Sequence, residues 1–92
     1  MLEKEKHLLS CIFDNPHIKE LAKKYSFVPQ DTYRLTILDK EQYTSLIDQA
    51  EIYTMLYHGT RIYRIPNSLM FVFKYYRKFY SINFDKNEKE NT

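Results

Sequence analysis

Apolar residues recur at helical spacing near the start of the chain. Leu8, Leu9, Ile12 and Phe13 fall on one face of an amphipathic helix that we predict for residues 2–13. Asn15 and Pro16 then open a second helix, because asparagine caps helix N-termini and proline suits the first turn, where its missing N–H has no partner anyway. The predicted buried stripe of this second helix is Ile18, Leu21, Ala22 and Tyr25.

The apolar period changes to two from Thr32 onward. Tyr33, Leu35 and Ile37 alternate with polar residues, which predicts a half-buried strand over residues 32–37. A third helix follows, since Asp39 and Gln42 have the spacing of a capping box. Its expected inner face is Tyr43, Leu46, Ile47 and Ala50.

The rest of the chain is rich in residues that favour strands. The runs 52–57 and 60–65 flank the only glycine, so His58-Gly59 predicts the turn of a hairpin. Residues 69–84 are crowded with phenylalanine, tyrosine, valine and isoleucine, which favours two further strands that turn near Arg77. The alternative for this segment is a helix capped by Asn67 or Ser68.

These elements predict an α+β fold. Two N-terminal helices, a strand and a third helix precede an antiparallel β-meander, whose last segment has the helical alternative. The chain of 92 residues is long enough for one hydrophobic core. We expect a single compact domain over residues 1–84 and a frayed polar tail over residues 85–92.

Charge separates the chain into unequal parts. Residues 1–51 carry nine acids and seven bases, whereas residues 52–84 carry no acid and five bases. Ten of the fifteen aromatic residues also lie in this acid-free segment. Tyrosine and arginine commonly anchor interfaces, and rings interleaved with cations also suit single-stranded nucleic acid. The predicted binding residues are Arg61, Arg64, Lys74, Tyr75, Tyr76, Arg77, Lys78 and Tyr80. Of the tyrosines, we expect Tyr75, Tyr76 and Tyr80 to be exposed.

Residues 18–37 resemble the helix-turn-helix of DNA-binding regulators in their first half. Leu21, Ala22 and Tyr25 fall at its core positions, and Ser26 stands where a glycine usually turns the chain. The resemblance implies a recognition helix in the second half, where the sequence instead alternates like a strand. The basic residues expected to contact nucleic acid under this hypothesis are Lys19, Lys23, Lys24 and Arg34.

Leu69–Tyr76 also resembles the aromatic strand of RNA-recognition domains through Phe71-Val72. The segment lacks the basic residue and the glycine that open that motif.

No catalytic or cofactor motif is present. His7 and Cys11 share a helix face, but a zinc site needs four ligands and only the distant His17 and His58 remain. One glycine cannot build a phosphate-binding loop. We therefore expect no enzymatic activity, no cofactor and no metal.

The single cysteine favours a reducing compartment, and there is neither a signal-peptide pattern nor an apolar run of membrane-spanning length. We expect a soluble, cytoplasmic protein that does not contact a membrane. The composition resembles that of proteins from AT-rich genomes, such as low-GC bacteria and their phages.

The favoured hypothesis is a non-catalytic protein-binding module. It would be a phage-type accessory protein or inhibitor that docks on a host complex involved in nucleic-acid handling or defence, through an acidic surface or a nucleic-acid groove. The alternative is a nucleic-acid-binding regulator that uses either a basic aromatic sheet or the helix-turn-helix-like segment 18–37.

Overall fold

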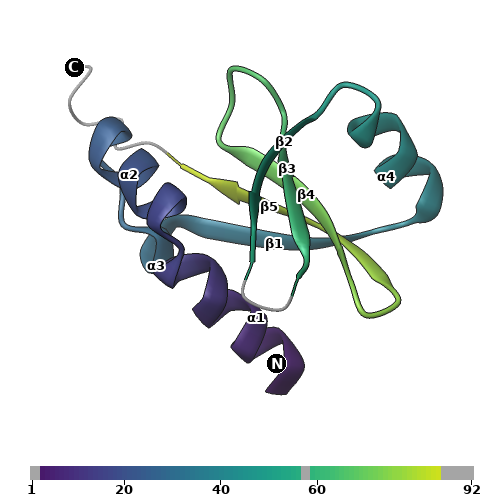
Figure 1. Cartoon of the computed structure of the whole chain (residues 1–92), viewed down its shortest axis with the longest axis horizontal. Coiled ribbons are helices and arrows are strands. Elements are labelled where there is room, and N and C mark those ends of the chain that lie inside the picture. The colour runs from purple at the N-terminus through teal and green to yellow at the C-terminus, as the bar shows by residue number, and fades with distance from the viewer. Residues whose placement is uncertain (1–2, 57–58, 86–92) are drawn as a thin grey trace.

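The computed structural model describes residues 3–56 and 59–85, which form four helices and five strands (Figure 1). The helices are α1 (Glu3–Asp14), α2 (Pro16–Tyr25), α3 (Pro29–Thr32) and α4 (Lys40–Ile47). The strands are β1 (Tyr33–Leu38), β2 (Glu51–Met55), β3 (Arg61–Arg64), β4 (Met70–Tyr75) and β5 (Lys78–Phe84). The predicted α+β architecture is confirmed. In the part of the chain described, no helix has the length and apolarity needed to cross a membrane.

The boundary between α1 and α2 follows from local capping. The Asn15 side-chain oxygen accepts hydrogen bonds from the backbone N–H groups of His17, at 2.9 Å, and Ile18, and Pro16 occupies the first helical position. Helix α2 ends at Ser26, which adopts the left-handed conformation with φ of 58°. The Ser26 backbone N–H donates to the carbonyl of Ala22, which closes the last turn.

The five strands form one antiparallel sheet in the order β1-β5-β4-β3-β2. Strands β2 to β5 follow one another as a meander, and β1 pairs with β5 at the far side. The pairing of β4 with β5 shows that the helical alternative for residues 69–84 is wrong. The aromatic and β-branched residues of this segment suit a pleated surface better than a helix.

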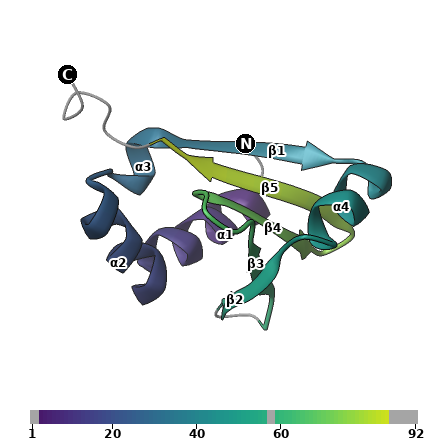
Figure 2. The ribbon, with the colours of Figure 1, turned by 90° about the horizontal axis from the view of Figure 1, so that it is seen from above.

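One face of the sheet carries the hydrophobic core and is covered by α1 and α2 (Figure 2). Phe73 of β4 lies directly opposite Tyr80 of β5, and their rings stack with centroids 5.5 Å apart. Phe27, just after α2, stacks in the same way on Phe84 at 5.2 Å. The buried members of the core are Leu8, Leu9, Ile12, Ile18, Leu21, Phe27, Leu56, Ile62, Leu69, Phe71, Phe73, Tyr75, Tyr80, Ile82 and Phe84.

Helix α4 packs on the opposite face, at the other end of the sheet from α2 (Figure 1). The Tyr43 ring stacks on Phe79 at 4.5 Å, and Val72 and Ser81 are buried on the same face. The predicted inner face of this helix is only half-buried, and the helix ends before Ala50. A helix of eight residues contributes too short a stripe to form a second core.

Two predictions about strand β1 and its start were wrong. Thr32 does not begin the first strand but ends the short helix α3, which the apolar pattern did not predict. Ile37, expected on the buried face, is 57% exposed. It faces the same side as Tyr80, yet β1 is an edge strand and gives Ile37 a neighbour on one side only.

The β2–β3 hairpin is confirmed, with shorter strands than expected. Its register shifts between Ile52 and Thr54, which indicates a β-bulge. Gly59 has the positive φ, 79°, for which glycine is suited, whereas His58 of the predicted turn lies outside the described residues.

Candidate binding site

The centre of the candidate site is the turn between β4 and β5. The ladder closes at the pair Tyr75 and Lys78, so Tyr76 and Arg77 form a two-residue turn, as predicted. Tyr76 has φ of 56°. A positive φ at the first central position of such a turn favours glycine, and another L-residue there costs on the order of 1–2 kcal/mol. A large aromatic side chain is therefore present at a position where the backbone disfavours it.

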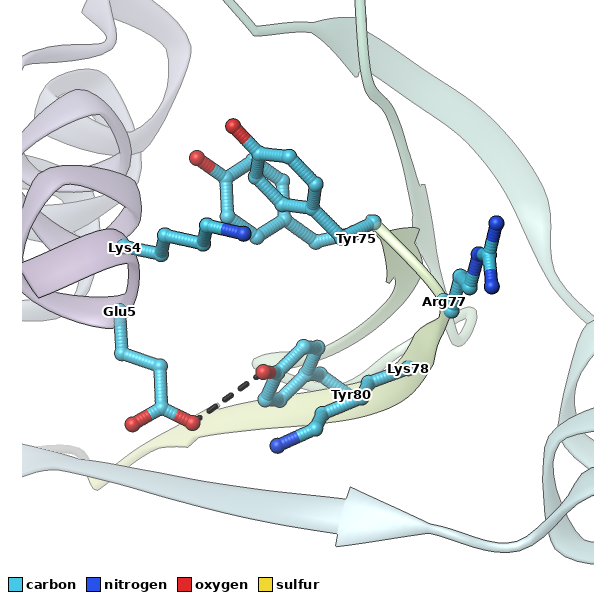
Figure 3. A pocket seen from close by; sticks show the side chains of 7 residues that line it. Lys4, Glu5, Tyr75, Arg77, Lys78 and Tyr80 are labelled. Carbon is cyan, nitrogen blue, oxygen red and sulfur yellow. Dashed lines mark hydrogen bonds between the residues drawn. The ribbon is translucent and has the colours of Figure 1, made fainter. Parts of the chain in front are cut away.

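The hairpin and the first turns of α1 enclose a pocket with a volume of about 320 Å³, which we call the hairpin pocket. Its lining residues are Lys4, Glu5, Tyr75, Tyr76, Arg77, Lys78 and Tyr80. Figure 3 shows the side chains of Lys4 and Glu5 extending from α1 toward the tyrosines, while the Arg77 guanidinium points away from them. The pocket thus joins two parts of the chain that lie about 70 residues apart in sequence.

The inner wall of the pocket consists of two neutral tyrosines. Tyr80 is only 3% exposed, and its hydroxyl donates a hydrogen bond to Glu5 Oε2 at 3.2 Å. Burial, followed by this hydrogen bond and the nearby Glu5 charge, raises the pKa of Tyr80 to about 12. Burial also raises the pKa of Tyr75, with a further contribution from Tyr76. Both hydroxyls therefore remain protonated near neutral pH.

The outer rim of the pocket is exposed and basic. Tyr76 is 62% exposed, and its ring packs edge-on against Tyr75 with centroids 4.6 Å apart. Lys4 Nζ lies 4.2 Å from the centroid of the Tyr76 ring, within the range of a cation–π interaction. Lys78 and Arg77 are exposed beside it. The rim therefore places one cation, Lys4, over the Tyr76 ring and carries two further exposed cations, Arg77 and Lys78, on the same hairpin.

The expectation that three tyrosines would be exposed was right for Tyr76 and wrong for Tyr75 and Tyr80. Successive strand residues point to opposite faces of the sheet. Tyr75 shares the core face with Phe73, and Tyr80 lies directly opposite Phe73, so both rings are covered by α1. Only Tyr76, in the turn, escapes this alternation.

The remaining predicted binding residues do not join the pocket. Arg61 is exposed on β3, whereas Arg64 is half-buried and its Nε donates to the Ser68 carbonyl at 2.8 Å. Lys74 lies on the opposite face from Tyr75, with Nζ 5.7 Å from the Phe79 ring centroid. The five bases of the acid-free segment therefore do not form one patch.

The segment that resembles a helix-turn-helix lacks its second helix. Helix α3 has four residues and leads directly into β1, so no recognition helix follows α2. The lysines at 19, 23 and 24 are exposed along α2. Arg34 Nη2 contacts Asp85 Oδ1 at 2.6 Å, so its charge is partly compensated. Asp85 begins the predicted tail, and residues 86–92 lie outside the described residues.

Sequence reasoning missed Lys4 and Glu5, because they belong to the mixed-charge N-terminal part and carry no motif. The sequence contains no signal that pairs Glu5 with Tyr80, 75 residues away. Their role depends on how α1 crosses the sheet, which the amphipathic pattern of α1 alone does not define.

His7 and Cys11 lie on one face of α1 as predicted, with Nε2 and Sγ 3.9 Å apart. Within residues 3–56 and 59–85, no group of three histidine, cysteine or acidic side chains is arranged to hold a metal ion.

Comparisons of the chain with protein-family models, with curated proteins and with solved structures found no match.

Proposed function

We propose that this protein is a non-catalytic module that docks on an acidic surface of a larger protein through the hairpin pocket and its rim. The observation that carries the proposal is Tyr76. This residue is exposed, holds an unfavourable backbone conformation and lies among Lys4, Arg77 and Lys78. Strained, exposed residues of this kind cluster at functional sites.

The residue types at the rim are those that anchor protein interfaces. Tyrosine supplies a large contact area with few rotatable bonds, and the edge-on contact with Tyr75 restricts its ring further. The surrounding cations favour an acidic partner and speed its encounter with the site.

The arrangement of the aromatic residues disfavours the alternative of a nucleic-acid-binding sheet. A platform for single strands needs several exposed rings on which successive bases stack. Among the described residues Tyr76 is the only phenylalanine or tyrosine that is largely exposed, whereas the others are buried or half-buried. The lysines of α2 are the remaining candidates for nucleic-acid contact, and they provide a control.

Two triple variants with the same change in charge test the proposal. The first replaces Lys4, Arg77 and Lys78 by glutamine, and the second replaces Lys19, Lys23 and Lys24 by glutamine. Each changes the formal net charge from +2 to −1. The immobilised proteins are exposed to a nuclease-treated lysate of a low-GC bacterium, and captured proteins are quantified by mass spectrometry.

We expect the first variant to lose at least about 90% of a specific captured protein, which corresponds to about 1.4 kcal/mol of binding free energy. The second variant should capture it like the wild type. Equal losses in both variants would show that capture depends on charge alone. Loss in the second variant only would favour the nucleic-acid alternative.

A further inference from the structure

The hairpin pocket has a largely aromatic interior, with the Glu5 carboxylate beside Tyr80, and a basic rim. Tyr75 and Tyr80 are buried, Glu5 is half-buried, and Lys4, Tyr76 and Lys78 are exposed. Figure 3 shows the Tyr75 ring on one side and the Tyr80 ring on the other, with Lys4 and Glu5 between them on the α1 side. A ligand that enters would meet cations first and aromatic rings afterwards.

The volume of the pocket limits its occupant to one small group. Ligand sites for whole small molecules begin near about 300 Å³ and extend to about 1,000 Å³. At about 320 Å³, the hairpin pocket is at the lower end of this range. It suits a single side chain of a partner better than a whole cofactor or a nucleotide.

The position of Glu5 determines the charge of that side chain. Its carboxylate accepts the hydrogen bond from the Tyr80 hydroxyl at the inner wall, so an anionic group placed beside the tyrosines would be repelled. Lys4 and Lys78 in the same lining disfavour a cation, so an uncharged group fits best beside the tyrosines. Aromatic rings prefer the offset and edge-on contacts that these tyrosines offer. Acidic groups fit only outside, beside Lys4 and Lys78.

We infer that the hairpin pocket binds one aromatic side chain from an acidic segment of the partner protein, with flanking carboxylates paired to the lysines of the rim. This inference rests on the proposed docking function and specifies the chemistry of the partner. It makes Tyr75 and Tyr80 the walls of an anchor pocket and Tyr76 the ring that closes its mouth.

Short peptides of defined sequence test this inference directly. The first probe is a five-residue peptide, blocked at both ends, with a central phenylalanine between pairs of aspartates. Two comparison peptides replace the phenylalanine by alanine or the four aspartates by asparagine, and a thymidine tetranucleotide serves as the nucleic-acid probe. Binding to the ¹⁵N-labelled full chain is followed by shifts of backbone amide signals.

We expect the first peptide to shift the signals of Glu5, Tyr75, Tyr76 and Lys78. Each comparison peptide should bind at least about tenfold more weakly than the first, since each lacks one of the two required features. An alanine peptide that binds as tightly as the phenylalanine peptide, or no shift at the pocket with any peptide, would overturn the inference. The proposed docking function would still stand or fall on the capture experiment.

Variants on the two faces of the hairpin give a matched control. Lys78→Gln should weaken binding of the first peptide several-fold, whereas Lys74→Gln, on the opposite face, should leave it unchanged. Tyr76→Gly removes the ring while relieving the backbone strain, so the chain remains folded and binding should fall about tenfold or more. Equal effects of the two lysine variants, or tighter binding of the tetranucleotide at the same residues, would contradict the assignment.

Discussion

Tyr80 shows how the surroundings of one residue change what it contributes. The sequence placed it among aromatic residues and bases, which suggested a surface role. In the fold its ring lies in the core beside Phe73, and its hydroxyl reaches Glu5. Its raised pKa makes the stability of the protein sensitive to alkaline pH.

The sign of this effect follows from the direction of the shift. The folded pKa of Tyr80, about 12, exceeds the value near 10 of an unfolded tyrosine, so the folded state keeps its proton longer. The associated stability is fully present below pH 10 and is lost as the pH rises toward 12. The wild type should lose on the order of 2 kcal/mol more than Tyr80→Phe over this window.

Urea unfolding of both proteins between pH 9 and pH 12 measures this difference. The pH profile of Glu5→Gln should differ from that of the wild type less than the profile of Tyr80→Phe does. The reason is that burial, and not Glu5, is the larger cause of the raised pKa of Tyr80. Parallel pH profiles for the wild type and Tyr80→Phe would contradict the assignment to Tyr80.

Residue exposure was the part of the site that sequence predicted least well. The turn residue Tyr76 was assigned correctly, because its position between two strands follows from local pattern. Tyr75 and Tyr80 were misassigned, since the face that each residue occupies depends on which side of the sheet α1 covers. The side that α1 covers is determined by tertiary packing, and the local sequence around Tyr75 and Tyr80 does not indicate it.

Among the secondary-structure elements, those with strong caps were predicted most accurately. The α4 capping box is present in full: Asp39 accepts from the Gln42 backbone N–H at 2.8 Å, and the Gln42 side chain accepts from Asp39 N–H at 2.9 Å. Helix α3 was missed because its four residues are too few to show an apolar period. The spacing of Asp39 and Gln42 therefore predicts where α4 begins, whereas the half-buried packing of α4 depends on the sheet against which it lies.

The cap of α4 should contribute measurably to stability. Asp39→Ala leaves the backbone N–H of Gln42 without its side-chain partner, so we expect the free energy of unfolding to fall by about 1 kcal/mol. Lys40→Ala, in the exposed first turn, is the control and should change it by less than about 0.5 kcal/mol. Chemical denaturation measures both, and equal effects would show that the capping box does not stabilise α4.

At the scale of the whole molecule, the stability resides in one face of one sheet. Phe73 and Ile37 both lie opposite Tyr80, on β4 and β1 respectively. Phe73 is 0% exposed beneath α1 and α2, whereas Ile37 is largely exposed at the edge. These two positions share a row of the sheet and differ in burial.

Truncating each of them tests where the core ends. Phe73→Ala should lower the free energy of unfolding by about 3–5 kcal/mol, a large share of the roughly 5–14 kcal/mol expected for a chain of this size. Ile37→Ala should lower it by less than about 1 kcal/mol. Thermal unfolding with circular dichroism compares the two. A large loss of unfolding free energy from Ile37→Ala would mean that the edge strand β1 contributes to the core at this position.

The position of β5 in the strand order determines how the chain folds as it is synthesised. This strand is the last described, yet it lies between β1 and β4. Ribosomes add about 5–20 residues per second, so the residues of α1 and α2 are synthesised several seconds before residue 84 completes the surface they cover. During that time their apolar residues lack this part of the core, and β1 has no strand to pair with. A premature stop before Lys78 would therefore remove an interior strand of the sheet and leave β1 without its partner, so we expect the truncated chain not to fold.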